Sequence, residues 1–368
     1  MKRPINPRLF IKTFGCIQNS ADSERILAFY WEKGYRLASD WKEADLVLIN
    51  TCIIRESAEN RAYGLINLVN KWNKKYDKKI QICVTGCLVG KSVRQKNGRG
   101  LLSLQKRFPA VSGFLPIDKI SYKIEPLRDK NRAALIPISS GCNNYCSYCI
   151  VPTSRGKEIS RDFQEILEEV DKSITNGFRE IVLIGQNVNS YGTDLIDSDK
   201  FVSMGKNRLK TLFPKLLSEI AQKPLDKISF ISSNPWDFDD KLIEVIAKNK
   251  NIDRLLHLPL QSGDDEILTK MNRGYTADEY LKLVSKIREK VADVRFSTDI
   301  IVGFPGESER AFENTKSVCE KVGFEIAYIN KYSPRKGTVS ADLYPNDIPQ
   351  AEKKRRWDVL NKLINTKG

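Results

Sequence analysis

Short apolar runs alternate with helical patterns along most of the chain. In the first part, the strand-like runs cover residues 9–14, 44–50 and 80–85. The helical patterns that follow them cover residues 23–33, 57–76 and 101–108. This alternation is typical of parallel strands joined by helical crossovers. It predicts a parallel α/β domain, which we place at residues 1–127.

A charged stretch at residues 125–134 separates this part from a second, longer alternation of strands and helices. Six strand-like runs follow, at residues 135–139, 180–184, 227–231, 254–258, 295–302 and 327–332. Right-handed crossovers wind such a series into an open barrel. We therefore predict an α/β chain whose second domain, residues 128–368, is a partial (β/α)6 barrel.

Three cysteines lie close together in the run SSGCNNYCSYC, namely Cys142, Cys146 and Cys149. No fourth cysteine follows until Cys319. A structural zinc site or an electron-transfer cluster normally has four ligands. Three thiolates at this spacing can hold a 4Fe-4S cluster and leave one iron open for a small molecule such as S-adenosylmethionine (SAM). The alternative is a zinc loop or three buried cysteines.

Three other cysteines each follow a strand-like run of the first domain: Cys16, Cys52 and Cys87. The carboxyl ends of parallel strands share one edge of a sheet, where ligands bind. We therefore expect these cysteines to meet in space, although unrelated core cysteines would show the same wide spacing. Cys83 and Cys319 match no motif and are interpreted as core residues.

The formal net charge is +15, and much of it is concentrated in one segment. Residues 71–107 contain eleven Lys and Arg but a single acid, Asp77. A second basic run covers residues 353–356. Local fields of this kind attract polyanions such as RNA. For both segments, a solvated surface that only aids solubility is the alternative.

The composition excludes several classes of protein. No apolar run approaches the roughly 20 residues of a membrane span, and the N-terminus has no signal-peptide pattern. Eight cysteines in such a chain favour metal ligation in a reducing cytoplasm over disulfides. We expect a cytoplasmic monomer.

The motifs resemble one known family over almost the whole chain. The chain resembles the methylthiotransferase family of radical SAM enzymes, particularly the branch that modifies tRNA. The matching stretches are TFGCIQNSADSE (13–24), INTCIIRESAE (49–59), VTGCLVG (84–90), GCNNYCSYCIVPTSRGKEISR (141–161), LIGQNVNSYG (183–192), LHLPLQSGDDEILTKMNRGYT (256–276), STDIIVGFPGE (297–307) and KYSPRKGT (331–338).

The chain departs from the family's usual pattern at three places, one of which is the stretch 91–100, whose role is open. The first motif reads Cys16-Ile-Gln-Asn19 where members usually have Cys-Gln-Met-Asn, which leaves the cysteine unchanged. Members usually end in a small RNA-binding β-barrel, and this sequence stops where that domain would begin. We therefore expect a chain without this β-barrel, either because the domain is naturally absent or because the chain has been cut.

The resemblance implies two 4Fe-4S clusters and SAM. Cys142, Cys146 and Cys149 would bind the cluster that cleaves SAM, and Cys16, Cys52 and Cys87 an auxiliary cluster that delivers sulfur. A radical formed from SAM would remove a hydrogen atom from C2 of an adenine. The methylthio group would then be joined to this carbon. The chemistry belongs to the cofactors, and the protein positions them.

Several residues near the expected strand ends would contact SAM. The resemblance places Tyr148 against the adenine of SAM, and Gln186 and Asn187 near its methionine part. Gln261 and Ser262 are placed to contact the ribose, and Asp299 and the turn at residues 303–307 to contact the ribose or adenine. Polar residues at strand ends could instead cap helices.

Other polar residues leave alternatives open. Four arginines in motif loops could bind phosphates or the SAM carboxylate, or form surface ion pairs: Arg155, Arg161, Arg273 and Arg335. The only histidine, His257, is interpreted as a hydrogen-bonded core residue.

The substrate must expose C2 of an adenine, which a loop nucleotide can do and a stacked helix cannot. The resemblance implies N6-isopentenyladenosine beside the anticodon of tRNA. It also implies a reductant such as flavodoxin or ferredoxin and a donor of sulfur or clusters. Alternatives are threonylcarbamoyl-adenosine in tRNA, a ribosomal protein, or an RNA-binding module with structural metals.

Overall fold

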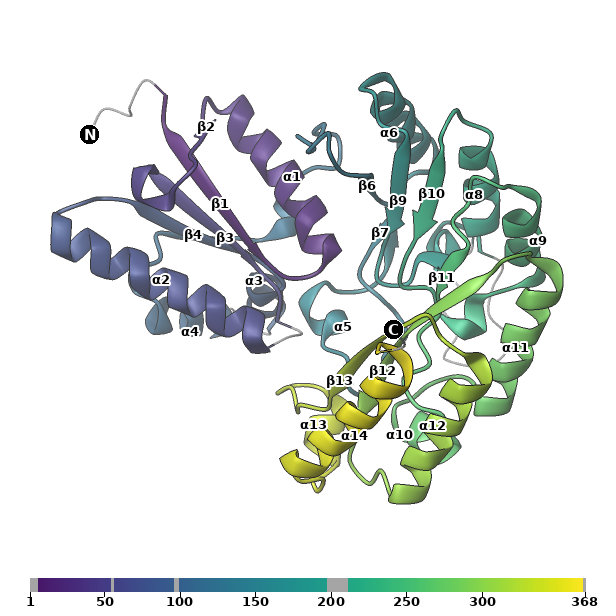
Figure 1. Cartoon of the computed structure of the whole chain (residues 1–368). Helices are drawn as coiled ribbons and strands as arrows, with labels where there is room; N and C mark the ends of the chain where they lie inside the picture. Colours follow the sequence, from purple (N-terminus) through teal and green to yellow (C-terminus); the bar gives the residue numbers. More distant parts are fainter. Residues whose placement is uncertain (1–5, 54–55, 96–98, 197–210, 367–368) are drawn as a thin grey trace. The chain divides into compact units, whose positions relative to one another are not determined.

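The computed structural model describes residues 6–53, 56–95, 99–196 and 211–366 (Figure 1). The chain divides into two compact units. The first comprises Met1–Pro137 together with Ile150–Lys157, and the second comprises Ile138–Cys149 and Glu158–Gly368. The boundary expected at residue 127 therefore differs from this division, in which a short later segment belongs to the first unit.

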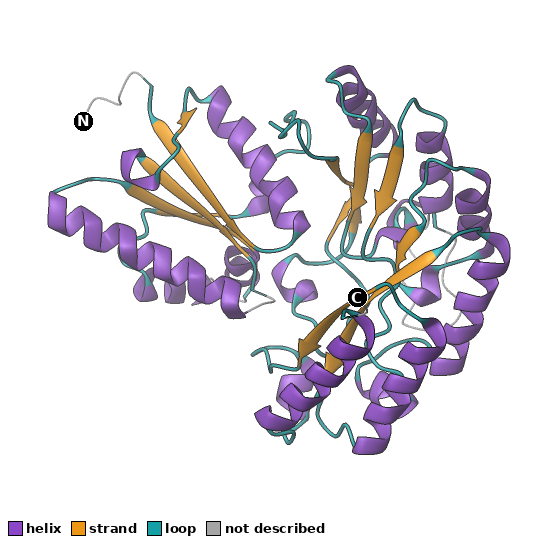
Figure 2. Cartoon of the chain, viewed as in Figure 1, coloured by secondary structure: helices purple, strands orange, loops and turns teal. Residues whose placement is uncertain are grey.

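The first unit contains a five-stranded sheet of order β2-β1-β3-β4-β5, in which all neighbouring strands are parallel (Figure 2). The strands are β1 (Arg8–Phe14), β2 (Arg36–Leu37), β3 (Leu46–Thr51), β4 (Gln81–Gly86) and β5 (Gly113–Leu115). The helices are α1 (Ile17–Glu32), α2 (Glu56–Tyr76), α3 (Cys87–Arg94) and α4 (Arg99–Arg107).

The central strand β3 is buried over its whole length. Because side chains alternate along a strand, Val47 and Ile49 belong to one apolar cluster and Leu46 and Leu48 to another. The first cluster includes Ile66 and other residues of α2, and the second includes Ile26 of α1. Helices thus cover both faces of the sheet, which explains why its central strands have nearly continuous apolar runs.

A short helix, α5 (Val151–Ser154), belongs to the same unit although it follows the Cys142–Cys149 run in sequence. Ile150 is buried in the apolar cluster beneath α2. Gly90 of α3 lies so close to the Ser154 carbonyl that a Cβ there would collide with it. Arg94 donates from Nη1 to the same carbonyl at 2.8 Å. The segment is therefore fixed by both apolar and polar contacts.

The second alternation of strands and helices forms two three-stranded sheets, of order β10-β9-β6 and β11-β12-β13. The strands are β6 (Ala134–Pro137), β9 (Glu180–Ile184), β10 (Lys227–Phe230), β11 (Leu255–His257), β12 (Arg295–Val302) and β13 (Ile326–Lys331). A short antiparallel pair joins β7 (Ser139–Ser140) and β8 (Ile159–Ser160). Parallel pairing of β9 with β10, and of β12 with β11 and β13, confirms the α/β class.

The helices of this part are α6 (Phe163–Thr175), α7 (Thr193–Ile196), α8 (Phe213–Ala221), α9 (Asp240–Lys248), α10 (Asp265–Lys270), α11 (Ala277–Lys290), α12 (Glu309–Val322), α13 (Val339–Leu343) and α14 (Gln350–Ile364), of which the sequence predicts α6, α8, α9, α11 and α12. Side-chain caps start five of them, from Asp162, Asp239, Asp264, Thr276 and Ser308. Such caps satisfy amide groups that the first helical turn leaves without a partner.

Candidate active site

Cys16, Cys52 and Cys87 meet at one edge of the first sheet. In the strand register, Phe14 pairs with Thr51 and Thr51 with Gly86. Cys16 and Cys52 follow the ends of β1 and β3, and Cys87 opens α3 directly after β4. The thiol of Cys87 interacts with those of both Cys52 and Cys16. The structure therefore brings these three residues together, as the sequence analysis predicts.

A buried polar network fixes the backbone around this trio. The Oδ1 atom of Asn19 accepts from the amide of Cys16 at 3.3 Å, and Asn19 donates to Asn50 at 3.0 Å. Asn50 in turn donates to the Asn19 carbonyl and to Ser23. Asn19 and Asn50 are fully buried. Since these residues come from α1 and β3, the network ties the Cys16 loop to the strand that precedes Cys52.

A buried ion pair lies beside the same cysteines. Arg155 Nη2 is 2.6 Å from Asp22 Oδ2, and both side chains are only 3% exposed. A hydrogen bond with Cys52, together with the nearby Arg155 guanidinium, lowers the pKa of the Cys87 thiol to about 6. Cys16 is exposed as a whole residue, but burial of its thiol raises the pKa of that group. The site thus favours a thiolate at Cys87.

Cys142, Cys146 and Cys149 gather in the loop after β7 in the second unit. The amide of Cys149 donates to the Cys146 carbonyl at 2.9 Å. Burial raises the pKa of the Cys142 thiol well above its ordinary value, and Glu158, Cys149 and Cys146 add to the effect. Ser147 binds the carbonyls of Met271 and Lys270 through its amide and hydroxyl. These bonds hold the loop against the end of α10.

Arg273 is the cation of this second trio. Its Nη1 donates to Cys146 Sγ at 3.4 Å, and its guanidinium lies 4.5 Å from the centre of the Trp236 ring. Burial raises the pKa of Tyr148 well above its ordinary value, with Cys146, Arg273, Cys149 and Tyr275 close enough to influence it. Arg273 is buried, which argues against a surface ion pair, and its contact with the cysteine loop is a role that the sequence did not indicate.

The residues expected to contact SAM have different environments. The Gly141 amide donates to the Gln186 side chain, so Gln186 supports the cysteine loop. Asn187 donates to Asp237 at 2.7 Å, while its own Oδ1 atom is buried without a partner. The buried hydroxyl of Ser139 also has no partner and lies against Gly185. Such orphaned polar atoms fit a polar ligand at this strand end.

The residues expected near the ribose make hydrogen bonds to other groups of the protein. Gln261 has a positive φ of 67°, and its amide donates to the Asp299 carbonyl at 2.8 Å. Ser262 is buried against Thr315 and accepts from the Asp264 amide, an arrangement that is typical of a helix start. The Asp299 carboxylate is paired with His257 Nε2 at 3.1 Å. His257 is therefore hydrogen-bonded as expected.

Comparisons with known proteins agree with this arrangement. The model of the radical SAM superfamily matches residues 136–319, and that of "Uncharacterized protein family UPF0004" matches residues 8–103. A tRNA-2-methylthio-N(6)-dimethylallyladenosine synthase of Thermotoga petrophila is 39% identical over 98% of this chain and 83% of its own length. The enzyme of the same name from Oceanobacillus iheyensis is 37% identical over 97% of this chain and 70% of its own.

The chain belongs to this family of radical SAM methylthiotransferases. It is therefore a radical SAM enzyme that uses a 4Fe-4S cluster and SAM. A solved structure of the radical SAM methyltransferase TsrM from Kitasatospora setae has a TM-score of 0.62, with 13% identity over 91% of this chain and 77% of that one. At this identity, the likeness shows the fold alone.

The donor set of this methylthiotransferase fits a cluster better than a single metal ion. Among the described residues, no three His, Cys, Asp or Glu side chains are placed to hold one ion. In a 4Fe-4S cluster, each thiolate binds a different iron, so the ligands need not converge on one point. The described chain also has no helix long and apolar enough to cross a membrane.

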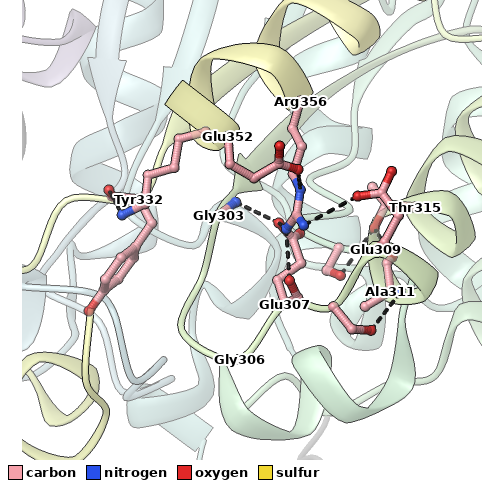
Figure 3. Close-up of polar contacts among 12 residues, drawn as sticks. Gly303, Gly306, Glu307, Glu309, Ala311, Thr315, Tyr332, Glu352 and Arg356 are labelled. Atoms are coloured by element: carbon pink, nitrogen blue, oxygen red, sulfur yellow. Dashed lines mark hydrogen bonds and ion pairs between the residues drawn. The ribbon is translucent and has the colours of Figure 1, made fainter. Parts of the chain in front are cut away.

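The glycine-rich turn after β12 is anchored by the last helix (Figure 3). Glu307 accepts from the Gly303 amide and, through Oε2, from Arg356 Nη1 at 2.7 Å. Lys353 is fully buried, and its ammonium donates to the Tyr332 carbonyl at 3.0 Å. Neither Lys353 nor Arg356 is free for a polyanion, so the interpretation of residues 353–356 as a solvated or RNA-binding basic run is wrong for these two.

The longer basic segment is largely exposed where the structure describes it. Its exposed lysines on and after α2 are Lys71, Lys74, Lys75, Lys78 and Lys79. Lys96 lies outside the described residues. Arg94 pairs with Asp118 at 2.6 Å, and Arg107 lies over Tyr63. Arg99 and Lys106 of α4 are exposed as well, so the exposed charge lies at the end of α2 and on α4.

Several residues that build the two sites carry no sequence signal of their role. Asn19, Asp22 and Asn50 lie within or beside recognised motifs, but a motif does not show what a side chain contacts. Trp236 and Glu158 stand outside any assigned role, although both lie close to charged groups of the second trio. Arg161 forms a buried ion pair with Glu169 at 2.7 Å, and Arg335 lies partly exposed after β13.

Proposed function

We propose that this methylthiotransferase modifies C2 of N6-isopentenyladenosine next to the anticodon of tRNA. The relatives' names state this base, because dimethylallyl and isopentenyl denote the same branched apolar group. The observation that supports the assignment most directly is the pair of three-cysteine sites, one at the carboxyl ends of β1, β3 and β4 and one in the loop after β7. A three-ligand cluster leaves one iron open for a further group.

The proposed roles of the cysteines follow from their surroundings. Cys142, Cys146 and Cys149 would hold the cluster that binds SAM, and Cys16, Cys52 and Cys87 the auxiliary cluster. When bound, these groups supply radical formation and sulfur delivery. Arg273 donates to Cys146, and Gln186 accepts from the backbone that precedes Cys142, so both orient the first loop.

The remaining site residues would position SAM. Asn187 offers a buried acceptor at the end of β9, which suits the ammonium group of the methionine part. Tyr148 follows Ser147, whose two hydrogen bonds fix the loop, and would lie against adenine. Gln261, Ser262 and Asp299 would line the ribose side, with the backbone of Gln261 held by β12.

The proposal extends to partners. The lysines at the end of α2 would contact tRNA phosphates, and the splayed anticodon loop would present the base. A reductant such as flavodoxin or ferredoxin and a donor of sulfur or clusters would act with the enzyme. We propose that it works as a monomer in the cytoplasm.

Mass spectrometry of tRNA nucleosides tests the function. Cells that lack the gene should lose 2-methylthio-N6-isopentenyladenosine and accumulate the unmodified isopentenyl nucleoside. The intact gene should restore the mark, and the Cys142→Ala variant should not. Loss of a methylthio mark from threonylcarbamoyl-adenosine or from a ribosomal protein instead would refute the substrate. Stoichiometric zinc without iron in protein purified anaerobically would refute the radical chemistry.

A further inference from the structure

We propose that Arg155, held in place by Asp22, is the positioning residue of the auxiliary cluster and sets its reduction potential. This inference rests on the proposed function, in which Cys16, Cys52 and Cys87 hold that cluster. It adds a residue from outside the three cysteine motifs. The guanidinium would offset the negative charge that the thiolates and the cluster together bring into the site.

The geometry gives Arg155 a fixed position. Its Nη2 atom is 2.6 Å from Asp22 Oδ2, and both side chains are almost completely buried. Gln18 donates to the other carboxylate oxygen of Asp22 at 3.3 Å. Because a buried charge needs a partner, Asp22 keeps the guanidinium in the site before any cluster is present.

The cysteines lie within electrostatic reach of the same guanidinium. The Arg155 guanidinium lies close enough to the Cys87 and Cys16 thiols to influence their pKa values, and it lowers that of Cys87. Asp22 neutralises the Arg155 guanidinium when no cluster is bound. The thiolates and the cluster add further negative charge, which Asp22 cannot offset because it is itself an anion. When a negatively charged cluster is bound, it adds negative charge to this site. Among the described contacts of the three cysteines, Arg155 is the buried cation that lies beside this added charge.

The backbone that carries Arg155 is also constrained. Ile150 is buried in the apolar cluster of the first unit, and the Ser154 carbonyl contacts Gly90 and accepts from Arg94. Gly90 lies on α3, the helix that Cys87 opens. The guanidinium and the Cys87 ligand are therefore attached to packed elements, so their separation is set by the fold.

This arrangement affects the potential in a definite direction. A cluster gains negative charge on reduction, and a nearby cation stabilises the reduced form. Removing the Arg155 charge should therefore make the auxiliary cluster harder to reduce. Loss of the cation beside the Cys87 ligand should also weaken retention of the cluster, by about 10–100-fold for outer-shell partners of this kind.

The test uses the full chain with Cys142, Cys146 and Cys149 replaced by alanine, so that only the auxiliary cluster is present. After anaerobic reconstitution, iron content, resistance to a chelator and the midpoint potential are measured. Arg155→Gln should shift the potential to more negative values and speed iron loss at least tenfold. Arg155→Lys should restore most of the potential, because it keeps the charge.

Arg356→Gln is the matched control, since it also removes a buried arginine that is paired with a carboxylate. It should lower stability without moving the potential. Equal potentials in the parent, Arg155→Gln and Arg155→Lys would overturn the proposal. If Arg155→Gln does not fold, Arg155→Lys alone decides. A midpoint potential of Arg155→Lys far from that of the parent would then overturn the proposal.

Failure of the proposed function gives a different result. If the parent with three substitutions takes up no iron, the auxiliary cluster itself is absent, and the role of Arg155 fails with it. If the parent takes up about four irons per chain, the auxiliary cluster is present, and only the comparison of the arginine variants decides the role of Arg155.

Discussion

Arg356 on the last helix donates to Glu307 in the glycine-rich turn after β12, with 2.7 Å between Nη1 and Oε2. The two side chains are 5% and 1% exposed. Arg356 also donates to the Glu307 carbonyl and to Glu352. The turn that the sequence motif assigns to SAM is therefore held by a helix about fifty residues later in the chain.

Replacing Arg356 with alanine should destabilise the protein strongly. The change leaves the Glu307 carboxylate buried without its cation, which typically costs about 3–5 kcal/mol. Arg355→Ala is the natural control, because Arg355 also binds Glu352 and Glu309 but is exposed. It should cost no more than about 1 kcal/mol. Urea unfolding measures both, and equal losses would contradict a special role for the buried pair.

Glu307 should also give the protein a particular dependence on pH. Burial raises the pKa of its carboxyl above the ordinary value, although Arg356 and the Gly303 amide act in the opposite direction. Just above pH 4.5, the folded state then holds a proton that the unfolded state has lost, so stability falls as the pH rises through this window. Glu307→Gln should remove this fall. Unfolding curves of both proteins between pH 4.5 and neutrality provide the check.

Gly86 should not tolerate alanine, because it lies between β4 and Cys87 with a φ of +88°. A Cβ there would come 2.6 Å from the Thr51 carbonyl and would also collide with Asn50. Gly34 has the same φ, but a Cβ at Gly34 would meet no atom within 4 Å, so Gly34→Ala measures the backbone strain alone, about 1–3 kcal/mol. Gly86→Ala should cost more, and it should reduce auxiliary iron. Thermal unfolding and iron analysis test this, and identical losses would exclude the collision.

Replacing Cys16, Cys52 and Cys87 together with alanine should halve the iron, from about eight to about four per chain. Reductive cleavage of SAM should persist, because the other trio is intact, while methylthiolation should stop. Cys83→Ala and Cys319→Ala serve as controls, since both thiols are buried outside the two trios. Loss of SAM cleavage in the triple variant, with four irons retained, would contradict this division of roles.

The lysines at the end of α2 should contribute to tRNA affinity. Changing Lys74, Lys75, Lys78 and Lys79 to alanine should weaken binding and flatten its dependence on salt, by about 0.7–0.9 in the logarithmic slope for each lost phosphate contact. Lys282 and Lys286 are exposed as well, but they are paired with Asp278 and Asp240. Their replacement should leave the slope unchanged. Filter binding at several salt concentrations distinguishes the two sets.

Much of the fold could be predicted because apolar runs mark buried parallel strands. The run at residues 44–50 corresponds to β3, Leu46–Thr51, which is buried throughout. Two strands of the same sheet were not predicted, β2 and β5. The two residues of β2 are exposed and the three residues of β5 only partly buried, so neither has the apolar run on which the prediction depends.

Only the site residues that belong to recognised sequence motifs could be predicted. Strand order alone explains why Cys16, Cys52 and Cys87 converge. The pairing of Asp22 with Arg155 spans 133 positions in sequence and has no local signal. The charge run at residues 353–356 misleads for the opposite reason, because sequence shows the charges but not that Lys353 and Arg356 turn inward.

The membership of Ile150–Lys157 in the first compact unit has a consequence for engineering and for evolution. The unit is discontinuous in the gene, so a fragment ending at Pro137 would lack a piece of its own interior. Chimeras that exchange the amino-terminal part between relatives must transfer this short insert as well. Recombination at a single crossover point would otherwise combine Arg155 from one parent with Asp22 and its neighbours from the other.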